Sequence, residues 1–262
     1  MKIAISGKGG VGKTLLSALL SKTFAEAGFT VLAIDADPVS TLAATLGIPD
    51  ADKITPISRM ADLIEERTGA KPGKTGSFFR LNPRVDDLPE KFSIKYNGIR
   101  FMLMGAIKKG GSGCYCPENV MLGALISHLL LQRDEVVIID MEAGIEHLGR
   151  ATSKAVDKLI VVVEPGRRSI EAAYSIKQLA QDIGVNNIAI VGNKVHDESE
   201  KQFMLSSLPG FEFLGFIPYD KALTEADIAG RPVLEASQPI RDAVKGIYQV
   251  LVSGAPVKSQ AK

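Results

Sequence analysis

The stretch that decides the fold is Gly7-Lys8-Gly9-Gly10-Val11-Gly12-Lys13-Thr14, which joins an apolar run at Lys2–Ser6 to a helical pattern at Thr14–Ala27. It matches G-x-x-x-x-G-K-[ST] in the strand, loop and helix context that this pattern requires. The glycines let the backbone curl so that several N–H groups converge on phosphate oxygens, and the helix N-terminus adds its positive end. The sequence therefore predicts a phosphate-binding loop.

Two side chains of this loop are expected to carry chemistry. Lys13 supplies a positive charge to the β- and γ-phosphates, and the hydroxyl of Thr14 is suited to ligate Mg²⁺. The predicted cofactors are therefore ATP or ADP together with Mg²⁺. The residues expected to bind the nucleotide are Gly7, Lys8, Gly9, Gly10, Val11, Gly12, Lys13, Thr14 and Leu15.

Outward from the loop, short apolar runs alternate with helical patterns. Nearly continuous runs of Ile, Val, Leu and Ala are typical of strands covered on both faces. The predicted strands are Lys2–Ser6, Thr30–Asp35, Phe101–Met104, Val136–Asp140, Leu159–Glu164, Ile188–Gly192 and Glu212–Pro218. The predicted helices are Thr14–Ala27, Glu118–Gln132, Ser169–Ile183, Asp220–Ile228 and Pro239–Val252. This alternation predicts an α/β fold with a doubly wound, mostly parallel sheet and helices on both faces.

The pattern predicts one domain over residues 1–252, followed by a polar C-terminal tail at 253–262. Residues 68–98 break the rhythm, because they combine several glycines and prolines with many charges. An insertion of this length in a compact α/β domain is often functional. A surface excursion without chemistry is an equally open interpretation.

Composition narrows the class of protein. The chain has 262 residues, 45% hydrophobic and 23% charged, which is ample apolar material for a core and excludes wholesale disorder. Its net charge of +1 argues against a dedicated nucleic-acid binder. No apolar run approaches the roughly 18–20 residues of a membrane helix, and the N-terminus has no signal-peptide core. Two cysteines do not make a disulfide framework, so we expect a cytoplasmic protein. From the net charge and the short apolar runs we expect neither a nucleic-acid nor a membrane partner.

Acidic residues stand at the ends of two predicted strands. Asp35 and Asp37 end the second strand, and Asp140 ends the strand Val136–Asp140. In open α/β sheets ligands bind at the carboxyl ends of strands, and carboxylates there suit Mg²⁺ and its waters. Helix capping is the alternative. For Asp35 the two readings stay equally open, whereas for Asp37 and Asp140 the loop context favours a functional role.

Asn193-Lys194 follows the predicted strand Ile188–Gly192 at another carboxyl end. An asparagine side chain offers one donor and one acceptor suited to a purine edge. The guanine signature Asn-Lys-x-Asp is not completed, since His196 stands where the aspartate would be. The sequence therefore favours adenine.

Cys114-Tyr115-Cys116 lies between a glycine-rich run and Pro117. In extended backbone, residues i and i+2 point to the same side, so both thiols can bind one ion. Pro117 suits the first position of a helix, and a helix N-terminus favours the thiolate that binds metal. Two thiolates are too few for a closed Zn²⁺ or Ni²⁺ site, but two copies of the loop across a twofold axis supply four. Two incidental cysteines in a loop are the alternative.

The string from Lys8 to Thr14 resembles the deviant Walker A sequence of the MinD/ParA/nitrogenase-Fe-protein class of P-loop ATPases (SIMIBI, MinD-like). In that class the early lysine reaches across a nucleotide-sandwich dimer, so the resemblance implies a homodimer in which Lys8 assists hydrolysis in its partner. It also implies that Asp37 orients or deprotonates the attacking water and that Asp140 is the Walker B acid. Asn193 and Pro218 would then flank the adenine base.

The Cys-x-Cys loop is expected at residues 105–117. Two longer stretches, Lys108 to Asn119 and Asp140 to Leu148, look like the CooC-type nickel-insertion ATPases. That family matures carbon monoxide dehydrogenase or the bifunctional carbon monoxide dehydrogenase/acetyl-CoA synthase. The resemblance implies an ATP-dependent nickel chaperone that holds Ni²⁺ or Zn²⁺ on Cys114 and Cys116 at the dimer interface and delivers nickel to the apo-enzyme. Leu15 and Thr41 depart from residues common in relatives. The alternatives are a MinD/ParA-like positioning ATPase and an Fe-protein-like electron carrier.

Overall fold

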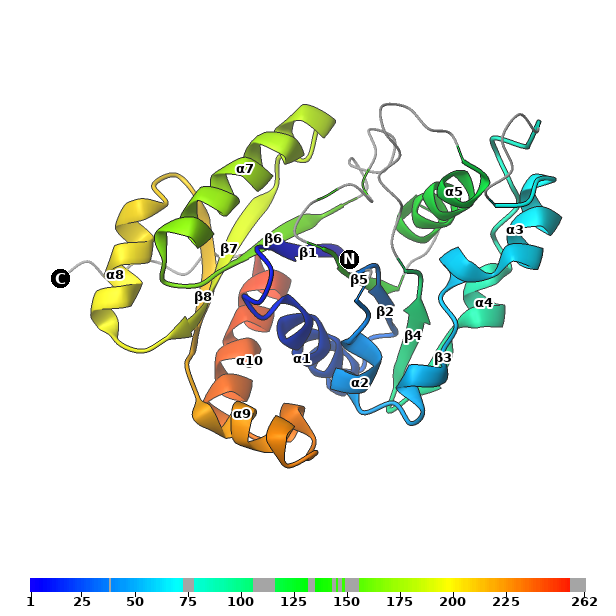
Figure 1. The fold of residues 1–262 in the computed structure, drawn as a ribbon. Helices are drawn as coiled ribbons and strands as arrows, with labels where there is room; N and C mark the ends of the chain where they lie inside the picture. Colours follow the sequence, from blue (N-terminus) through cyan, green and yellow to red (C-terminus); the bar gives the residue numbers. More distant parts are fainter. Residues whose placement is uncertain are drawn as a thin grey trace.

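The central sheet has the strand order β3-β4-β2-β5-β1-β6-β7-β8 in the computed structural model (Figure 1). The structure describes residues 1–37, 39–72, 78–105, 116–131, 135–142, 145, 148 and 156–254. Every strand pairing is parallel except that of β3 with β4. The strands are β1 (Lys2–Gly7), β2 (Val31–Asp35), β3 (Ile94–Tyr96), β4 (Ile99–Leu103), β5 (Val136–Asp140), β6 (Lys158–Val163), β7 (Ile188–Val195) and β8 (Glu212–Pro218).

Helices cover both faces of the sheet (Figure 1). One layer contains α1 (Lys13–Glu26), α2 (Leu42–Leu46), α9 (Lys221–Ile228) and α10 (Gln238–Ser253). The opposite layer contains α3 (Ala61–Thr68), α4 (Leu88–Phe92), α5 (Pro117–Leu131), α7 (Arg167–Ile183) and α8 (Glu198–Ser207). Three short 3₁₀ helices are η1 (Ala51–Lys53), η2 (Ile57–Arg59) and η3 (Val233–Glu235). The doubly wound α/β architecture predicted from the sequence is confirmed.

The core is divided by the sheet into two hydrophobic clusters. Successive residues of a strand point to opposite faces. Ala4 of β1 therefore packs under α5 and α7, whereas Ile3 and Ile5 pack under α1 and α10. Because both faces are covered, every residue of β1 is buried, which explains its unbroken apolar sequence.

The strand order reverses around β1, which has β5 on one side and β6 on the other. In open α/β sheets such a reversal creates a crevice outside the carboxyl ends of the strands, where ligands bind. The loop that follows β1 leads directly into α1 at this crevice. The topology therefore places the phosphate loop predicted from the sequence at the expected binding edge.

The predicted strands and helices agree with the structure to within one to three residues, and β5 and β8 have the predicted bounds. Four short helices, α2, α3, α4 and α8, and strand β3 were not anticipated. The shortest of them span only five residues, too few to show a periodic pattern, and α3 and α8 are rich in charge. Strand β7 runs three residues further than predicted, to Val195.

The described part of the segment predicted as an insertion, residues 68–72 and 78–98, lies at the edge of the sheet. It contains α4 and β3, and β3 pairs antiparallel with β4. Arg67 at the end of α3 donates to Asp87 over 2.8 Å, and hydrogen bonds from Lys91 and Arg67 hold the pKa of Asp87 well below its ordinary value. Arg100 of β4 pairs with Glu90 at 2.9 Å. These contacts are structural and do not decide between a functional insertion and a surface excursion.

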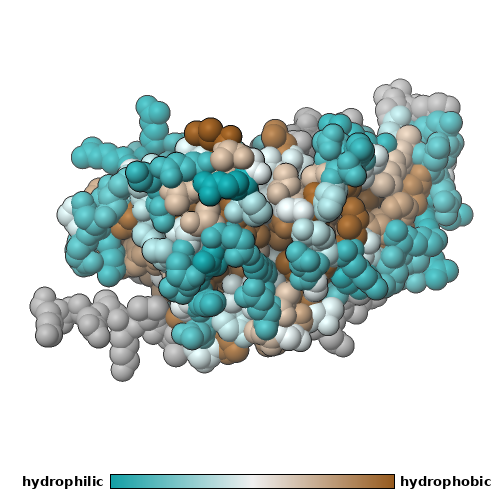
Figure 2. Space-filling model, turned by 90° about the horizontal axis from the view of Figure 1, so that it is seen from below, coloured by the Kyte–Doolittle hydropathy of each residue, from teal (hydrophilic) through white to brown (hydrophobic). Residues whose placement is uncertain are grey.

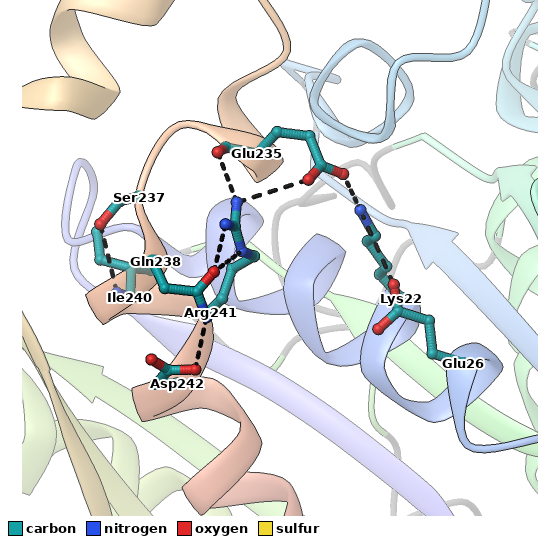
Figure 3. A network of polar contacts seen from close by, with 8 residues as sticks. All are labelled: Lys22, Glu26, Glu235, Ser237, Gln238, Ile240, Arg241 and Asp242. Atoms are coloured by element: carbon teal, nitrogen blue, oxygen red, sulfur yellow. Dashed lines mark hydrogen bonds and ion pairs between the residues drawn. The ribbon is translucent and has the colours of Figure 1, made fainter.

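A polar network anchors the far half of α1 to η3 and α10 (Figure 3). Glu235 pairs with Lys22 of α1 and, at 3.5 Å, with Arg241 of α10. The Nε of Arg241 also donates to Gln238 over 3.2 Å. These side chains are partly exposed, so each pair contributes little alone, but together they orient the helix that begins in the phosphate loop.

The helix layer formed by α1, α2, α9 and α10 is the outer surface of the molecule on that side of the sheet (Figure 1). Figure 2 shows hydrophilic side chains over much of this face, with hydrophobic residues between them. Within the described ranges, no helix combines the length and hydropathy of a membrane span.

Candidate functional site

The phosphate loop takes its shape from glycines in conformations that other residues avoid. Gly10 and Gly12 have φ angles of 80° and 95°, and Gly12 caps the N-terminus of α1. A Cβ atom on Gly12 would collide with the side-chain amide of Asn193, and one on Gly7 would lie 2.5 Å from the carbonyl oxygen of Val162. A side chain at Gly7 or Gly12 is therefore excluded by the neighbouring strands as well as by the backbone.

The loop lysine Lys13 is folded onto its own loop. Its side chain is buried, and its ammonium donates to the carbonyl oxygen of Lys8 over 3.3 Å. The N–H of Val11 makes a longer contact of 3.4 Å with the same oxygen. Lys8 itself is half-buried beside the exposed Gly9 and Gly10. The two lysines therefore have different positions: Lys13 is buried within the loop and bonds to its backbone, whereas Lys8 lies at the solvent-facing rim.

Asp140 is held at the carboxyl end of β5 by two hydroxyl groups of α1. Thr14 Oγ1 donates to Asp140 Oδ2 over 2.7 Å, and Ser17 Oγ lies 3.1 Å from Oδ1. Asp140 is 1% exposed, and this burial raises its pKa to about 7. The negative charge of Asp35 adds to the increase, while the hydroxyl groups and Lys13 oppose it.

These residues fit a magnesium ion. The hydroxyl of Thr14 and the carboxylate of Asp140 are the hard oxygen donors that Mg²⁺ prefers, and they already lie within 2.7 Å of each other. A buried carboxylate whose pKa is raised by burial is also one whose ionised form a cation would stabilise. The predicted pairing of these two residues around one site is consistent with the geometry.

Asp35 organises the loop that follows β2. It lies beside Asp140 in the parallel pairing of β2 with β5. Its carboxylate accepts hydrogen bonds from Asp37 N at 3.1 Å, Ser40 Oγ at 2.7 Å and Leu42 N at 3.0 Å. Leu42 begins α2, so the capping interpretation left open for Asp35 describes part of what it does. Burial raises the pKa of Asp35 above its ordinary value.

Asp37 lies two residues beyond the end of β2, at the edge of the crevice. Its carboxylate accepts a hydrogen bond from Val39 N over 2.8 Å, which turns the loop back on itself. Pro38 lies outside the described residues. The role of Asp37 toward an attacking water therefore stays a prediction.

The position of Asn193 and Lys194 differs from the prediction. They lie inside β7 rather than after it, because the pairing of β7 with β8 shifts register between Gly192 and Val195 and lets the strand continue. Asn193 is 4% exposed, and its Nδ2 donates to the carbonyl oxygen of Val11 over 2.7 Å. At least one donor of this predicted base-binding residue is thus committed to the phosphate loop.

Three residues near the loop, Ser17, Glu164 and Lys194, were assigned no role from the sequence. Ser17 supports Asp140, as described above, and Lys194 donates to the carbonyl oxygen of Gly10 over 2.7 Å while pairing with Glu164 at 3.3 Å. Ser17 lies three residues after Thr14, on the same face of α1, and this spacing of two hydroxyl groups is the sequence signal that could have indicated a shared contact with Asp140. Nothing in the sequence spacing could have paired Lys194 with Glu164, which lie 30 positions apart.

Pro218 ends β8 and lies opposite Val195 of β7. The next residue, Tyr219, donates its N–H to the carbonyl oxygen of Val195 over 2.9 Å, and its ring stacks on His196 with centroids 4.6 Å apart. The structure therefore brings the strand ends that carry Asn193 and Pro218 side by side. The role of these two residues in flanking an adenine base stays a prediction.

Cys116 immediately precedes α5, and its carbonyl oxygen accepts the hydrogen bond from Val120 N over 3.1 Å. The prediction that Pro117 opens this helix is confirmed. The side chain of Cys116 is half-buried, while Cys114 and residues 106–115 around it lie outside the described residues. In the part of the chain that the structure describes, no group of three or more His, Cys, Asp or Glu residues could hold a metal ion.

Comparison with known proteins agrees with this geometry. The family model of the CobQ/CobB/MinD/ParA nucleotide binding domain matches residues 2–233. The chain is 45% identical over 255 residues to the carbon monoxide dehydrogenase accessory protein CooC of Rhodospirillum rubrum, covering 96% of each chain. It is also 45% identical over 247 residues to an uncharacterised ATP-binding protein of Methanocaldococcus jannaschii, covering 94% of this chain and 95% of the relative.

Among solved structures, the cell division protein MinD of Aquifex aeolicus is similar with a TM-score of 0.69 and 23% identity, over 97% of both chains. At this identity the likeness supports the fold alone. The family model and the R. rubrum relative each span most of the chain. The chain therefore belongs to the CobQ/CobB/MinD/ParA family of nucleotide-binding domains and, within it, to the CooC-type ATPases.

Proposed function

We propose that this protein is a Mg²⁺-dependent ATPase that acts as a nickel chaperone for carbon monoxide dehydrogenase or for the bifunctional carbon monoxide dehydrogenase/acetyl-CoA synthase. The assignment of the target enzyme rests on the 45% identity, over 96% of both chains, to a carbon monoxide dehydrogenase accessory protein. The phosphate loop, with Thr14 hydrogen-bonded to Asp140, supports the ATPase activity.

Nucleotide chemistry is assigned to residues at the carboxyl edge of the sheet. The loop amides bind the phosphates, and Lys13 exchanges the Lys8 carbonyl oxygen for a phosphate oxygen. Thr14 and Asp140 hold Mg²⁺, whose charge offsets that of the phosphate oxygens. Asp37 accepts a proton from the attacking water or orients it, once its carboxylate leaves Val39 N.

Lys8 is assigned the role of contacting the nucleotide of a second copy of the chain in a dimer. The rim of the phosphate loop is its most exposed part, since Gly9 and Gly10 beside Lys8 are both open to solvent. A second copy of the chain can therefore approach this lysine without disturbing Lys13, which is buried beneath it. A cation delivered across the interface adds positive charge where negative charge develops in the transition state.

Cys114 and Cys116 are assigned as the ligands of the metal ion that the protein delivers. Cys116 is half-buried at the N-terminus of a 15-residue helix, where the helix dipole favours a thiolate. Two copies would supply the four thiolates that a Ni²⁺ or Zn²⁺ ion needs. Nucleotide-dependent dimerisation would then assemble and release the metal site, which couples hydrolysis to delivery.

Equilibrium dialysis with Ni²⁺ and Zn²⁺ tests this coupling, on the apo protein, with ADP and with a non-hydrolysable ATP analogue. Light scattering on the same samples gives the oligomeric state. We expect one metal per dimer, a stoichiometry that changes with nucleotide, and loss of the metal in the double variant Cys114→Ala/Cys116→Ala. Ser127→Ala, on the helix that follows Cys116, is the matched control and should bind metal normally.

Other outcomes favour the alternative functions. No bound metal with normal ATP-driven dimerisation would contradict the chaperone function and leave a positioning ATPase as the better interpretation. A brown protein with an iron–sulfur cluster after anaerobic purification would favour the electron carrier. The structural likeness to MinD does not decide between them, because at 22–23% identity it supports the fold only.

A further inference from the structure

We infer that Lys194 is a positioning residue of the phosphate loop, which holds the Gly10 carbonyl from strand β7 so that the loop amides face the phosphates. Glu164 in turn holds the ammonium of Lys194. This inference rests on the nucleotide-binding function proposed above. It adds a lysine of β7 and a glutamate that follows β6 to the residues on which phosphate affinity depends.

Two adjacent residues of β7 hold two adjacent carbonyl groups of the loop. Asn193 Nδ2 donates to the Val11 oxygen and Lys194 Nζ donates to the Gly10 oxygen, each over 2.7 Å. In a trans peptide the C=O of one residue and the N–H of the next point in opposite directions, and no cis peptide occurs among the described residues. Holding the Gly10 and Val11 oxygens toward β7 therefore turns the N–H groups of Val11 and Gly12 away from it, toward the inside of the loop.

The backbone of Lys194 supports a functional role. Its φ angle is 58°, and the other non-glycine residues with positive φ in the described ranges are Asp50 and Asn97. Asp and Asn adopt this left-handed region more readily than lysine does. The conformation occurs where the pairing of β7 with β8 shifts register. Strain of this kind persists where the surrounding structure requires it, and here it accompanies a side chain that reaches across to the loop.

The contacts of Lys194 indicate positioning rather than phosphate binding. Its ammonium is already used by the Gly10 oxygen and by Glu164 Oε2 at 3.3 Å, so its charge is partly offset. Lys13, by contrast, lies within the loop, where it contacts a loop carbonyl. Its charge acts on Asp140, but no acid among the described residues forms a direct ion pair with it. Lys13 is therefore the loop cation available to phosphate, and Lys194 acts through the backbone that it holds.

Two substitutions separate this role from folding. Lys194→Met keeps most of the side chain and removes the amine. Lys194→Gly also removes the amine but relieves the positive φ, which offsets the lost hydrogen bond and ion pair, so this variant should unfold at about the same temperature as the wild type. Lys221→Met is the matched control, because Lys221 is an exposed lysine at the start of α9 and pairs only with Glu225 in the described structure.

Dissociation constants for ADP and for adenosine are then measured with Mg²⁺, by competition with a fluorescent ADP analogue. We expect both Lys194 variants to bind ADP about tenfold more weakly, the loss typical of one charge-assisted hydrogen bond. Affinity for adenosine, which has no phosphate, should be unchanged, and Lys221→Met should bind both ligands as the wild type does.

The inference is overturned if Lys194→Met binds ADP within twofold of the wild type, or if adenosine affinity falls in parallel with ADP affinity. A wild-type protein that binds no ADP would instead refute the proposed nucleotide function itself. Glu164→Gln gives an independent check. It should weaken ADP binding less than Lys194→Met does, and the double variant should be no weaker than Lys194→Met, because Glu164 acts through Lys194.

Discussion

Replacing Asp140 with asparagine should stabilise the metal-free protein at neutral and alkaline pH. Asp140 is 1% exposed, and burial raises its pKa from 3.8 to about 7. The folded protein therefore favours the protonated carboxyl, and the unfolded chain releases the proton more readily. The free energy of unfolding of the wild type falls as the pH rises from 3.8 to about 7. Asparagine has nearly the same shape and does not titrate.

The size of the effect follows from the shift. A change of roughly three pKa units corresponds to about 4 kcal/mol between the protonated and ionised forms. Most of it falls between pH 5 and pH 8, where the wild type should lose about 2.5 kcal/mol relative to Asp140→Asn. The hydrogen bonds of Thr14 and Ser17 to the ionised carboxylate already lower the pKa of Asp140 and are contained in this figure, so they do not alter the trend.

Urea unfolding in EDTA, without nucleotide, measures this difference at pH 5, 6, 7 and 8. The control is Asp182→Asn, on the exposed side of α7, whose curve should run parallel to that of the wild type. With Mg²⁺ and ADP the gap should shrink, because a cation at Thr14 and Asp140 stabilises the ionised carboxylate. A difference between wild type and Asp140→Asn that stays constant from pH 5 to pH 8 would refute the reasoning.

Three further variants test the loop. Gly12→Ala should lower the free energy of unfolding by about 2 kcal/mol or more, because a left-handed alanine is strained and its Cβ meets Asn193; a urea midpoint equal to that of the wild type would contradict the steric argument. Thr14→Val should leave ADP affinity insensitive to Mg²⁺ in a fluorescence titration, since the hydroxyl beside Asp140 is lost; a normal Mg²⁺ response would exclude this ligand. Lys8→Ala should bind nucleotide but fail to dimerise with ATP, and a dimer seen by light scattering would disprove the trans role.

Much of the site could be anticipated because its signals are local. The phosphate loop is one continuous stretch whose glycine spacing reflects backbone geometry, so its position after β1 and before α1 follows from the sequence. The strand that ends in Asp140 is apolar throughout, because it is buried on both faces. Such patterns extend along a whole element, so they can be recognised in the sequence without knowing which residues the element contacts.

The shorter elements could not be anticipated in the same way. Helix α2 has five residues and is held at its first residue by Asp35, from the preceding strand. Strand β3 has three residues and forms because its backbone pairs antiparallel with β4. The stability of these elements comes from tertiary contacts rather than from an internal period.

The sequence by itself determined the fold class, the phosphate loop and the acid at the end of β5, because each depends on residues close together in the chain. Only the tertiary structure decided how the loop is held. The side chains of Asn193 and Lys194 reach carbonyl groups of Gly10 and Val11 more than 180 positions away, and Asn193 thereby contributes to the loop in addition to any contact with a base. Which distant donor meets which carbonyl depends on strand order and on a register shift in β7, and neither is encoded in a local pattern.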